Sequence, residues 1–390
     1  MPDAVIVAAV RTPVGKRNGG LSGVHPVDLS AHVLESLVAR AGIEPRLVDD
    51  VVWGCVYQVG EQAVNVGRNA VLAAGWPEEI PGTTIDRQCG SSQQAVSFAA
   101  AEVIAGQADV VVAGGVESMS RVPMMASAQG PGQPFGPRMD ARYGGFVFDQ
   151  GRGAEMLARR WGLSRTEVDE IALRSHQLAA AAQDAGAFDD EIAPVTLPDG
   201  TVIGADEGIR RTTSMDALAG LKTVFDPQGV VTAGNASQIS DGAAALLVTT
   251  SEKAAELGLT PLVRIHTTTV VGVDPISMLT GPIPATVKVL ARAGLRASDI
   301  GVFEVNEAFA PVIGAWWAEI EKVGDLDREA LEARTNPRGG AIALGHPLGG
   351  SGARIMTTLI AAMRAGGHRY GLQTMCEGGG MANATILELL

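Results

Sequence analysis

The 390-residue chain has few cysteines and fewer basic than acidic residues, and each of these shortages argues against certain classes of protein. Its three cysteines, Cys55, Cys89 and Cys376, include no close pair, so neither a disulfide framework nor a structural zinc site is expected. Basic residues number 30 against 43 acidic ones, which opposes binding to nucleic acid or to an anionic membrane. No apolar run reaches the ~18 residues of a membrane span, and the N-terminus lacks the basic region of a signal peptide. These absences favour a globular protein of the reducing cytoplasm, with no metal, nucleic acid or membrane as partner.

Glycine, by contrast, is abundant, with 49 residues that follow no period. The glycines cluster in turns, as in α/β enzymes whose loops approach a ligand closely. Between the turns lie short apolar runs such as VIVAA, residues 5–9, and VVVA, residues 110–113. Runs of this length, bounded by turns, predict strands that are buried on both faces, as in a parallel sheet. Helical runs of ten or more residues alternate with these strands, and we therefore predict a layered α/β architecture.

The chain contains an internal duplication. Residues 43–56 and residues 295–309 both run from a helix end through an aspartate into a buried strand and a turn. Residues 89–117 and residues 345–379 both run from a glycine turn through a helix and a strand into a second glycine turn. The repeated plan predicts two similar α/β halves.

A stretch of different character separates the two halves. Residues 118–239 are rich in Met, Gly, Pro and Arg at first, and then contain helical segments near 151–162 and 164–185. We interpret this stretch as an inserted cap over the site. The first half then comprises residues 1–117 plus about 240–262, and the second half comprises residues 263–390.

Two cysteines lie in glycine-flanked turns. Cys89 lies within DRQCGSSQQA, and Cys376 lies within TMCEGGG. The residues after Cys89 begin an Ala-rich helix, whose N-terminal dipole favours a thiolate. The glycines after Cys376 allow backbone N–H groups to face a ligand and form an anion hole. A free cysteine is otherwise a small buried hydrophobe, which is how we interpret Cys55 within its apolar strand.

Two further polar residues occupy turns or strand ends. His346 lies between Gly345 and Pro347, directly after an apolar run. Asn306 ends another apolar run, where a buried polar side chain needs a partner. Loops on a rigid sheet are favoured places for catalytic groups. Two thiols, a histidine and an asparagine together make a site that can break or form a carbon–carbon bond next to a thioester.

Over essentially its whole length, the sequence resembles the thiolases, which are acetyl-CoA acyltransferases. Two long stretches carry much of this resemblance, GNASQISDGAAALLV at 234–248 and NPRGGAIALGHPLGGSGAR at 336–354. The resemblance implies a thiolase-like fold, in which two duplicated halves form a layered αβαβα sandwich with an inserted cap. Four turns match the active-site loops of the family, Cys89-Gly90-Ser91, Asn306-Glu307-Ala308-Phe309, Gly345-His346-Pro347 and Cys376-Glu377-Gly378.

The resemblance also implies a role for each matched residue. Cys89 would take the acyl group as a thioester, and His346 would activate Cys89 and help to bind the thioester oxygen. Cys376 would protonate or deprotonate the methyl carbon of acetyl-CoA. Asn306 would hold a water that forms one oxyanion hole with His346, and the backbone N–H groups of Cys89 and Gly378 would form the other.

Coenzyme A is implied as a substrate, and no tightly bound cofactor or metal is expected. Ser237 would contact its pantetheine, and Arg210 would meet its phosphates. Phe225, Ala236 and Phe309 would line the pantetheine tunnel. The implied partners are acyl-CoA, 3-ketoacyl-CoA and CoA, and the chain itself is expected to form a homodimer or homotetramer.

One stretch departs from the short-chain members of the family. Short-chain biosynthetic thiolases often show His-Met-Gly where this chain has Asp149-Gln150-Gly151. Residues 276–280 are more similar to actinobacterial degradative thiolases, including some that act on bulky sterol-derived chains. We therefore expect degradative cleavage of 3-ketoacyl-CoA to acetyl-CoA or propionyl-CoA and a shortened acyl-CoA. The alternative is a short-chain acetyl-CoA acetyltransferase that makes acetoacetyl-CoA.

Other classes fit the residues less well. A dinucleotide-binding oxidoreductase needs G-x-G-x-x-G after a strand, and that spacing is not found. A serine hydrolase needs G-x-S-x-G, whereas residues 349–353 end in Ala353. A decarboxylating condensing enzyme of the same fold would pair Cys89 with two histidines, but the last loop carries Cys376. A binding protein without catalysis is expected to have lost one of the four polar groups.

Overall fold

The computed structural model describes residues 2–146, 148–323 and 325–390. Its main feature is a mixed sheet of ten strands in two parts, with the orders β1–β8–β5–β3–β4 and β9–β12–β11–β10. Strands β1 and β9 join the parts through two residue pairs, and β2 pairs with β8. The strands are β1 (Val5–Arg11), β2 (Gly15–Lys16), β3 (Asp50–Gly54), β4 (Thr83–Ile85), β5 (Val110–Ser118), β8 (Ser240–Thr249), β9 (Val263–Gly272), β10 (Ile300–Val305), β11 (Tyr370–Glu377) and β12 (Met381–Leu389).

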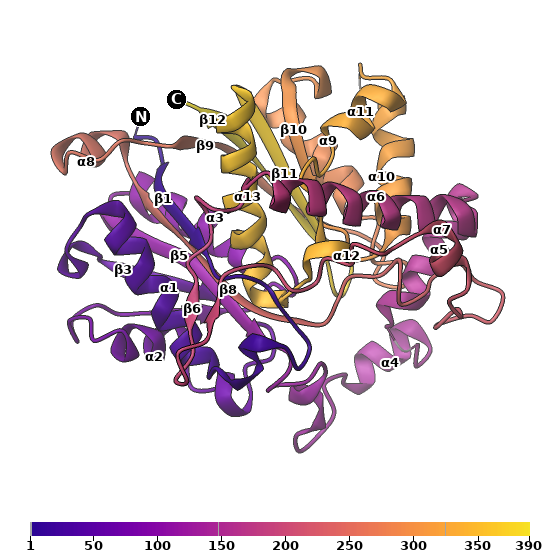
Figure 1. Ribbon diagram of the computed structural model, residues 1–390, viewed down its shortest axis with the longest axis horizontal. Coiled ribbons are helices and arrows are strands. Elements are labelled where there is room, and N and C mark those ends of the chain that lie inside the picture. The colour runs from indigo at the N-terminus through magenta and orange to yellow at the C-terminus, as the bar shows by residue number, and fades with distance from the viewer. Residues whose placement is uncertain (1, 147, 324) are drawn as a thin grey trace.

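Five layers of secondary structure stack in the order helix, sheet, helix, sheet, helix (Figure 1). Helices α1 (Pro26–Ala41) and α2 (Val66–Ala73) cover the outer face of the first sheet part. Helices α3 (Ser91–Ile104) and α13 (Ser351–Gly366) pack on each other between the two parts. Helices α9 (Pro282–Ala293) and α10 (Ala310–Val323) cover the outer face of the second part. This arrangement confirms the predicted αβαβα sandwich.

The two sheet parts repeat one strand plan, as the duplication predicts. In the first part β3 pairs in parallel with β5, and β8 then pairs antiparallel with both β5 and β1. In the second part β10 pairs in parallel with β11, and β12 then pairs antiparallel with both β11 and β9. The end of β3, the start of α3 and the loop before α13 meet in one place, because a Cβ on Gly54 would lie 2.5 Å from Ser92 N and 2.8 Å from Gly349 O.

The prediction that VIVAA and VVVA lie in purely parallel sheet is wrong. The first run belongs to β1, whose neighbours β8 and β9 are both antiparallel to it. The second belongs to β5, which is parallel to β3 and antiparallel to β8. Along β5, Val110 and Val112 face the outer helices while Val111 and Ala113 face the inner ones. A continuous apolar run therefore indicates that a strand is buried on both faces, but it does not indicate whether the strand pairs in parallel or antiparallel fashion.

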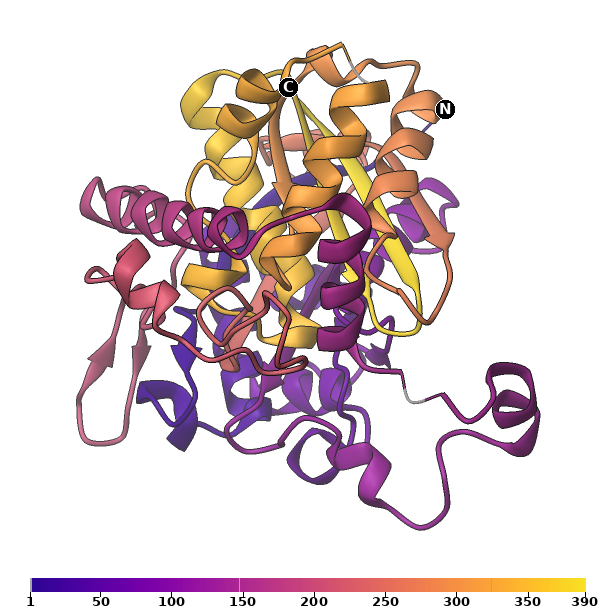
Figure 2. The same cartoon turned by 90° about the vertical axis from the view of Figure 1, so that its right-hand side faces the viewer.

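The segment between β5 and β8 holds the predicted cap helices. Helix α5 (Gln150–Trp161) begins after Asp149, and α6 (Arg165–Asp184) begins with a capping box between Ser164 and Glu167. The segment around α4 (Pro137–Tyr143) extends away from the body (Figure 2). The chain also contains β6 (Val195–Thr196), β7 (Val202–Ile203), α7 (Met215–Ala219), α8 (Ser251–Glu256), α11 (Arg328–Arg334), α12 (Ala341–Leu344) and the 3-10 turns η1 (Gly20–Gly23), η2 (Pro45–Leu47), η3 (Gly60–Gln62), η4 (Ala126–Gln129), η5 (Ala297–Asp299) and η6 (Leu348–Gly350). Within the described ranges, no helix is long and apolar enough to cross a membrane.

Candidate active site

Cys89 lies in the short turn between β4 and α3. The residue before it, Gln88, has a φ of 48°, a left-handed conformation that is unusual for a side chain other than glycine. Ser91 holds this turn, because its Oγ donates to Gln88 O (2.6 Å) and accepts from Arg87 N–H (2.9 Å). The turn therefore presents the thiol at a fixed place before the first residues of α3.

The thiol of Cys89 is uncharged at rest, although its place at a helix N-terminus favours a thiolate. Burial, assisted by the negative charge of Glu377, raises the pKa of Cys89 to about 12. Its own backbone N–H, that of Gly378 and the Gln150 side chain act in the opposite direction, because they hydrogen-bond the charged sulfur. Desolvation outweighs these donors and the helix N-terminus, so a thiolate forms only when a base takes the proton.

Cys376 and Asn306 lie side by side because β10 and β11 are parallel neighbours. Val305 pairs with Thr374 in the register, and the backbone N–H of Asn306 donates to Thr374 O (3.0 Å). Cys376 follows two residues later and is fully buried. Burial, followed by the charge of Cys89, raises the pKa of Cys376 well above that of an ordinary thiol. The two sulfurs are therefore close enough to couple electrostatically.

His346 is a neutral, buried base. Burial, assisted by the positive charge of Arg354, lowers the pKa of His346 to about 3. Its Nδ1 lies 2.6 Å from Ser351 Oγ, and Ser351 donates its own proton to Pro347 O (2.8 Å). Ser351 Oγ can then only accept, so Nδ1 carries the imidazole proton. This tautomer leaves the lone pair on Nε2, which lies 3.4 Å from Asn306 Nδ2.

Asn306 has an amide oxygen that remains available for a ligand. Its Oδ1 is buried and has no hydrogen-bond partner in the described parts of the chain. A buried polar atom of this kind needs a partner, such as a water or a substrate group. The structure thus brings His346 and Asn306 into contact, and β11 places Cys376 next to Asn306.

A buried carboxylate that the sequence did not single out connects several of these loops. Glu117, at the end of β5, accepts hydrogen bonds from the backbone N–H groups of Val56 (2.9 Å), Tyr57 (3.1 Å) and Gly349 (2.9 Å). Gln62 adds a side-chain donor at 2.7 Å. The loop that follows His346 is therefore fixed to the end of the first sheet part.

Four of the five residues expected to bind CoA lie together. Ala236 and Phe309 form a backbone bridge, and Ser237 N–H donates to Ala308 O (2.9 Å). The Phe225 ring meets Phe309 edge-on, with 6.0 Å between the ring centroids. Phe309 also belongs to the apolar cluster that contains Cys376. These residues thus adjoin Cys376, one of the residues predicted to be catalytic.

The fifth, Arg210, is exposed and lines a neighbouring cavity of about 430 Å³. Gly234 and Gln238, which flank Ala236 and Ser237 in the chain, line the same cavity. The backbone N–H of Arg210 donates to His176 Nδ1 (3.1 Å). The structure therefore places Arg210 beside the segment that carries two of the other expected CoA residues.

At residues 149–151, where the sequence differs from the His-Met-Gly pattern, the structure shows contacts that the sequence did not reveal. Asp149 caps α5 by accepting the Arg152 N–H (2.9 Å), and Gln150 reaches Cys89. A Cβ on Gly151 would lie 2.2 Å from the Phe225 ring, so glycine is needed there for the ring to fit. Met278, in the stretch with degradative character, is buried in the same apolar cluster as Cys376.

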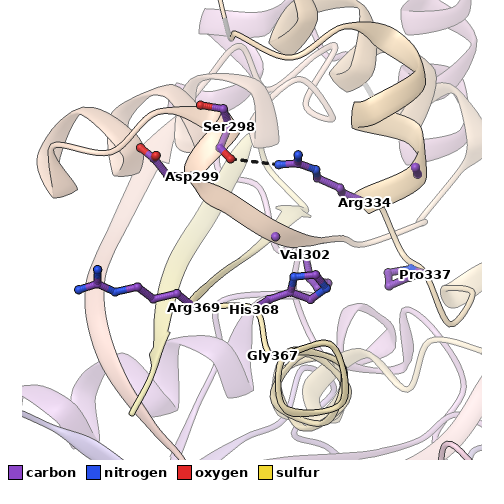
Figure 3. Close-up of a pocket in the computed structure, with 10 residues that line it drawn as sticks. Ser298, Asp299, Val302, Arg334, Pro337, Gly367, His368 and Arg369 are labelled. Carbon is purple, nitrogen blue, oxygen red and sulfur yellow. Dashed lines mark hydrogen bonds between the residues drawn. The ribbon is translucent and has the colours of Figure 1, made fainter.

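A second cavity, of about 460 Å³, lies at the opposite ends of β10 and β11 (Figure 3). Arg334 and Arg369 line it, but the first donates to Ser298 O (3.1 Å) and the second to Glu388 (2.9 Å). It shares no residue with the predicted site. This cavity and the predicted site therefore lie at opposite ends of β10 and β11.

The chain belongs to the thiolase family. A model of the thiolase N-terminal domain matches residues 4–252, and a model of the thiolase C-terminal domain matches residues 259–389. The protein is accordingly an acyltransferase, and the sequence-based assignment to this family is confirmed.

Individual relatives agree with this assignment. The steroid 3-ketoacyl-CoA thiolase FadA6 of Mycobacterium tuberculosis is 49% identical over 398 residues, which cover 100% of this chain and 95% of that protein. A 3-ketoacyl-CoA thiolase of Escherichia fergusonii is 46% identical over 396 residues, with full coverage of both proteins. The crystal structure of the Bacillus anthracis acetyl-CoA acetyltransferase matches with a TM-score of 0.90 and 41% identity, over 100% of this chain and 99% of that one.

Proposed function

We propose that this protein catalyses the reversible, CoA-dependent thiolytic cleavage of 3-ketoacyl-CoA. The products are acetyl-CoA or propionyl-CoA and a shortened acyl-CoA, formed in the cytoplasm during breakdown of lipids or sterol side chains. The observation that carries the proposal is the convergence of two buried thiols with the His346–Asn306 pair. The names of the Mycobacterium and Escherichia relatives support the degradative direction.

Cleavage begins with Cys89 as nucleophile. His346 Nε2 takes the thiol proton as the sulfur attacks the 3-keto carbon of the substrate. The bond between C2 and C3 then breaks, so the acyl group stays on the sulfur and the electron pair passes into the thioester enolate. Because both partners begin uncharged in a buried site, proton transfer is coupled to attack and no free thiolate accumulates.

Cys376 completes the first half-reaction by giving its proton to C2, which releases acetyl-CoA. The enolate oxygen is held by His346 and by a water on Asn306, and the backbone N–H groups of Cys89 and Gly378 hold the oxygen of the transferred acyl group. In the second half-reaction the Cys376 thiolate takes the proton of incoming CoA. The CoA sulfur attacks the acyl carbon, and Cys89 leaves as it regains its proton from His346.

CoA binding is proposed for the Phe225–Phe309 pair, Ala236 and Ser237, with Arg210 on the phosphates. A homodimer or homotetramer is proposed as the assembly. Its support is the cap segment before α5, where Met124, Met125 and Phe135 are exposed. Light scattering at micromolar concentration tests the assembly, and a monomer would refute it.

The test of the function is a thiolysis assay with 3-ketoacyl-CoA substrates of increasing length and bulk. Each buried methylene adds about 0.8 kcal/mol of binding, so four carbons are worth about two decades in kcat/KM if the transition state realises that binding. We expect kcat/KM to rise from acetoacetyl-CoA to 3-ketooctanoyl-CoA or a branched analogue. A steep fall would indicate the short-chain acetyl-CoA acetyltransferase instead.

Two cysteine variants test the division of roles. Cys89→Ala should take up no acyl group from acyl-CoA, as measured by mass spectrometry of the intact protein. Cys376→Ser should still be acylated but should lose both thiolysis and exchange of the acetyl-CoA methyl protons with solvent. Equal acylation of the first variant, or retained exchange in the second, would contradict the assigned roles.

A further inference from the structure

Glu377 is a buried carboxyl group that the proposed reaction does not use. It follows Cys376 on β11, so its side chain points to the opposite face of the strand, toward the start of α3. The residue is fully buried. Neither carboxyl oxygen has a hydrogen-bond partner among residues 2–146, 148–323 and 325–390. A buried carboxylate without partners is strongly disfavoured, so its protonation state needs an explanation.

The carboxyl group rests against the turn that carries Cys89. A Cβ built on Gly90 would lie 2.0 Å from Glu377 Oε1 and 2.6 Å from Asn383 Nδ2. Asn383, on β12, donates from this nitrogen to Gly90 O (3.1 Å). Position 90 must therefore be glycine; Asn383 hydrogen-bonds the backbone directly after Cys89, and the Glu377 carboxyl packs against it.

The hydrogen-bond inventory around Gly90 favours a protonated carboxyl. The Oδ1 of Asn383 is buried and, in the described part of the chain, has no donor. An ionised Glu377 would add only further acceptors, whereas a carboxylic acid supplies one O–H donor. The uncharged form therefore suits this space better than the charged form.

Charged and titratable groups face Glu377 from each neighbouring element. Asp86 and Arg87 precede the Cys89 turn and act on the charge of Glu377, and Glu377 acts in turn on Cys89 and on its chain neighbour Cys376. Burial dominates and raises the pKa of Glu377 to about 8, although Arg87 lowers it and Asp86 raises it further. Conversely, a negatively charged Glu377 raises the pKa of both Cys89 and Cys376.

We propose that Glu377 is a positioning residue that works as an uncharged carboxylic acid: its proton supports the Gly90 turn beneath Cys89, and its ionisation places a negative charge beside both sulfurs and suppresses their reactivity. This inference rests on the proposed role of Cys89 as the nucleophile. It predicts that the reaction slows at alkaline pH as Glu377 ionises, a loss that ionisation of the thiols or of His346 would not cause.

Alkylation of Cys89 by iodoacetamide, followed by peptide mass spectrometry across about pH 6.5 to 9.5, tests the inference. Thiol reactivity should rise about tenfold per pH unit when no other group ionises, because the thiolate fraction does so. Glu377→Gln mimics the uncharged acid. We expect the ratio of its alkylation rate to that of the wild type to grow by about fivefold between about pH 7 and 9 and to approach about tenfold at higher pH, for about one unit of coupling.

Two further variants separate positioning from packing. Glu377→Leu has similar bulk but no donor, so it should react more slowly than Glu377→Gln at every pH. Glu304→Gln is the matched control, since burial also raises the pKa of Glu304 to about 8, but that carboxyl faces Arg354. The control should keep the wild-type pH profile.

A rate ratio that does not change with pH, or equal rates for the Gln and Leu variants, would overturn the inference. If the variants fail to fold, the wild-type profile decides alone, because a uniform tenfold rise per pH unit through about pH 8 is incompatible with ionisation of Glu377 beside the thiol. Alkylation does not depend on substrate cleavage. If thiolysis fails but the alkylation rate of Cys89 still rises less steeply above about pH 8, the proposed function is rejected and this inference stands.

Discussion

Ser351 provides the sharpest test of how the site orients its base. It accepts the Nδ1 proton of His346 at 2.6 Å, which fixes the tautomer that leaves Nε2 free. In Ser351→Ala, the buried N–H loses its acceptor, which costs roughly 1–3 kcal/mol. If that cost falls on the productive orientation of the base, kcat/KM for thiolysis should fall by roughly 5- to 150-fold, at 1.36 kcal/mol per decade.

The matched control is Ser92→Ala. Ser92, at the start of α3, is as buried as Ser351. Its Oγ accepts the N–H of Ala353 (2.9 Å) at the start of α13, but it does not contact His346. Both variants should lose stability to a similar degree in a thermal melt. Only the Ser351 variant should lose kcat/KM and slow the acylation of Cys89. Wild-type kinetics in that variant, or an equal loss in the control, would refute the role assigned to Ser351.

Three other predictions follow from the cavity, the buried histidine and the aromatic contact. Arg210→Ala should raise KM for CoA a few-fold with little change in kcat, because an exposed phosphate contact is partly screened. Arg211 lines the same cavity but is already paired with an acidic side chain, so Arg211→Ala should have less effect on KM. A large loss of kcat in Arg210→Ala would contradict the proposed phosphate contact. Burial, assisted by Arg210, lowers the pKa of His176 to about 4, so only the unfolded state binds its proton between about pH 6.5 and 4 and stability falls as pH decreases. Denaturant melts of His176→Gln should show a slope smaller by about 1.4 kcal/mol per pH unit in that window, and an unchanged slope would exclude a buried neutral His176. Gly151→Ala should destabilise the protein by about 1–3 kcal/mol and raise KM for CoA by displacing Phe225; unchanged melting and KM would mean that the ring moves freely.

The sequence was sufficient to predict the layers, and it was sufficient to single out the four segments proposed as catalytic. Cys89 and His346 lie in glycine-flanked turns before helices, and Cys376 lies at the end of β11 just before three glycines; such local patterns are visible without a fold. The helix at 164–185 was also predictable, because its capping box lies within four residues. The roles of these residues, and the boundaries of the cap, stay predictions for the experiments above.

Other features depend on contacts between distant parts of the chain. Glu117 meets Gly349 across 232 residues, and no local pattern marks it as the acceptor for that loop. Gln150 reaches Cys89 from the cap, and the sequence alone showed only a departure from a family pattern. The burial that raises the pKa of Cys89 is likewise contributed by the whole fold, whereas the helix N-terminus that favours its thiolate is local.

The packing of α3 against α13 has a consequence for how the protein is made. A Cβ on Gly352 would lie 2.3 Å from the backbone N of Gln93, so the two helices meet almost backbone to backbone. Until residues 351–366 leave the ribosome, nothing covers the side of α3 that packs on α13, nor the part of the inner sheet face that α13 covers. The nascent first half must therefore be protected from aggregation for more than 200 residues of synthesis. For the same reason, two fragments divided near residue 255 should recover activity only when they are produced together.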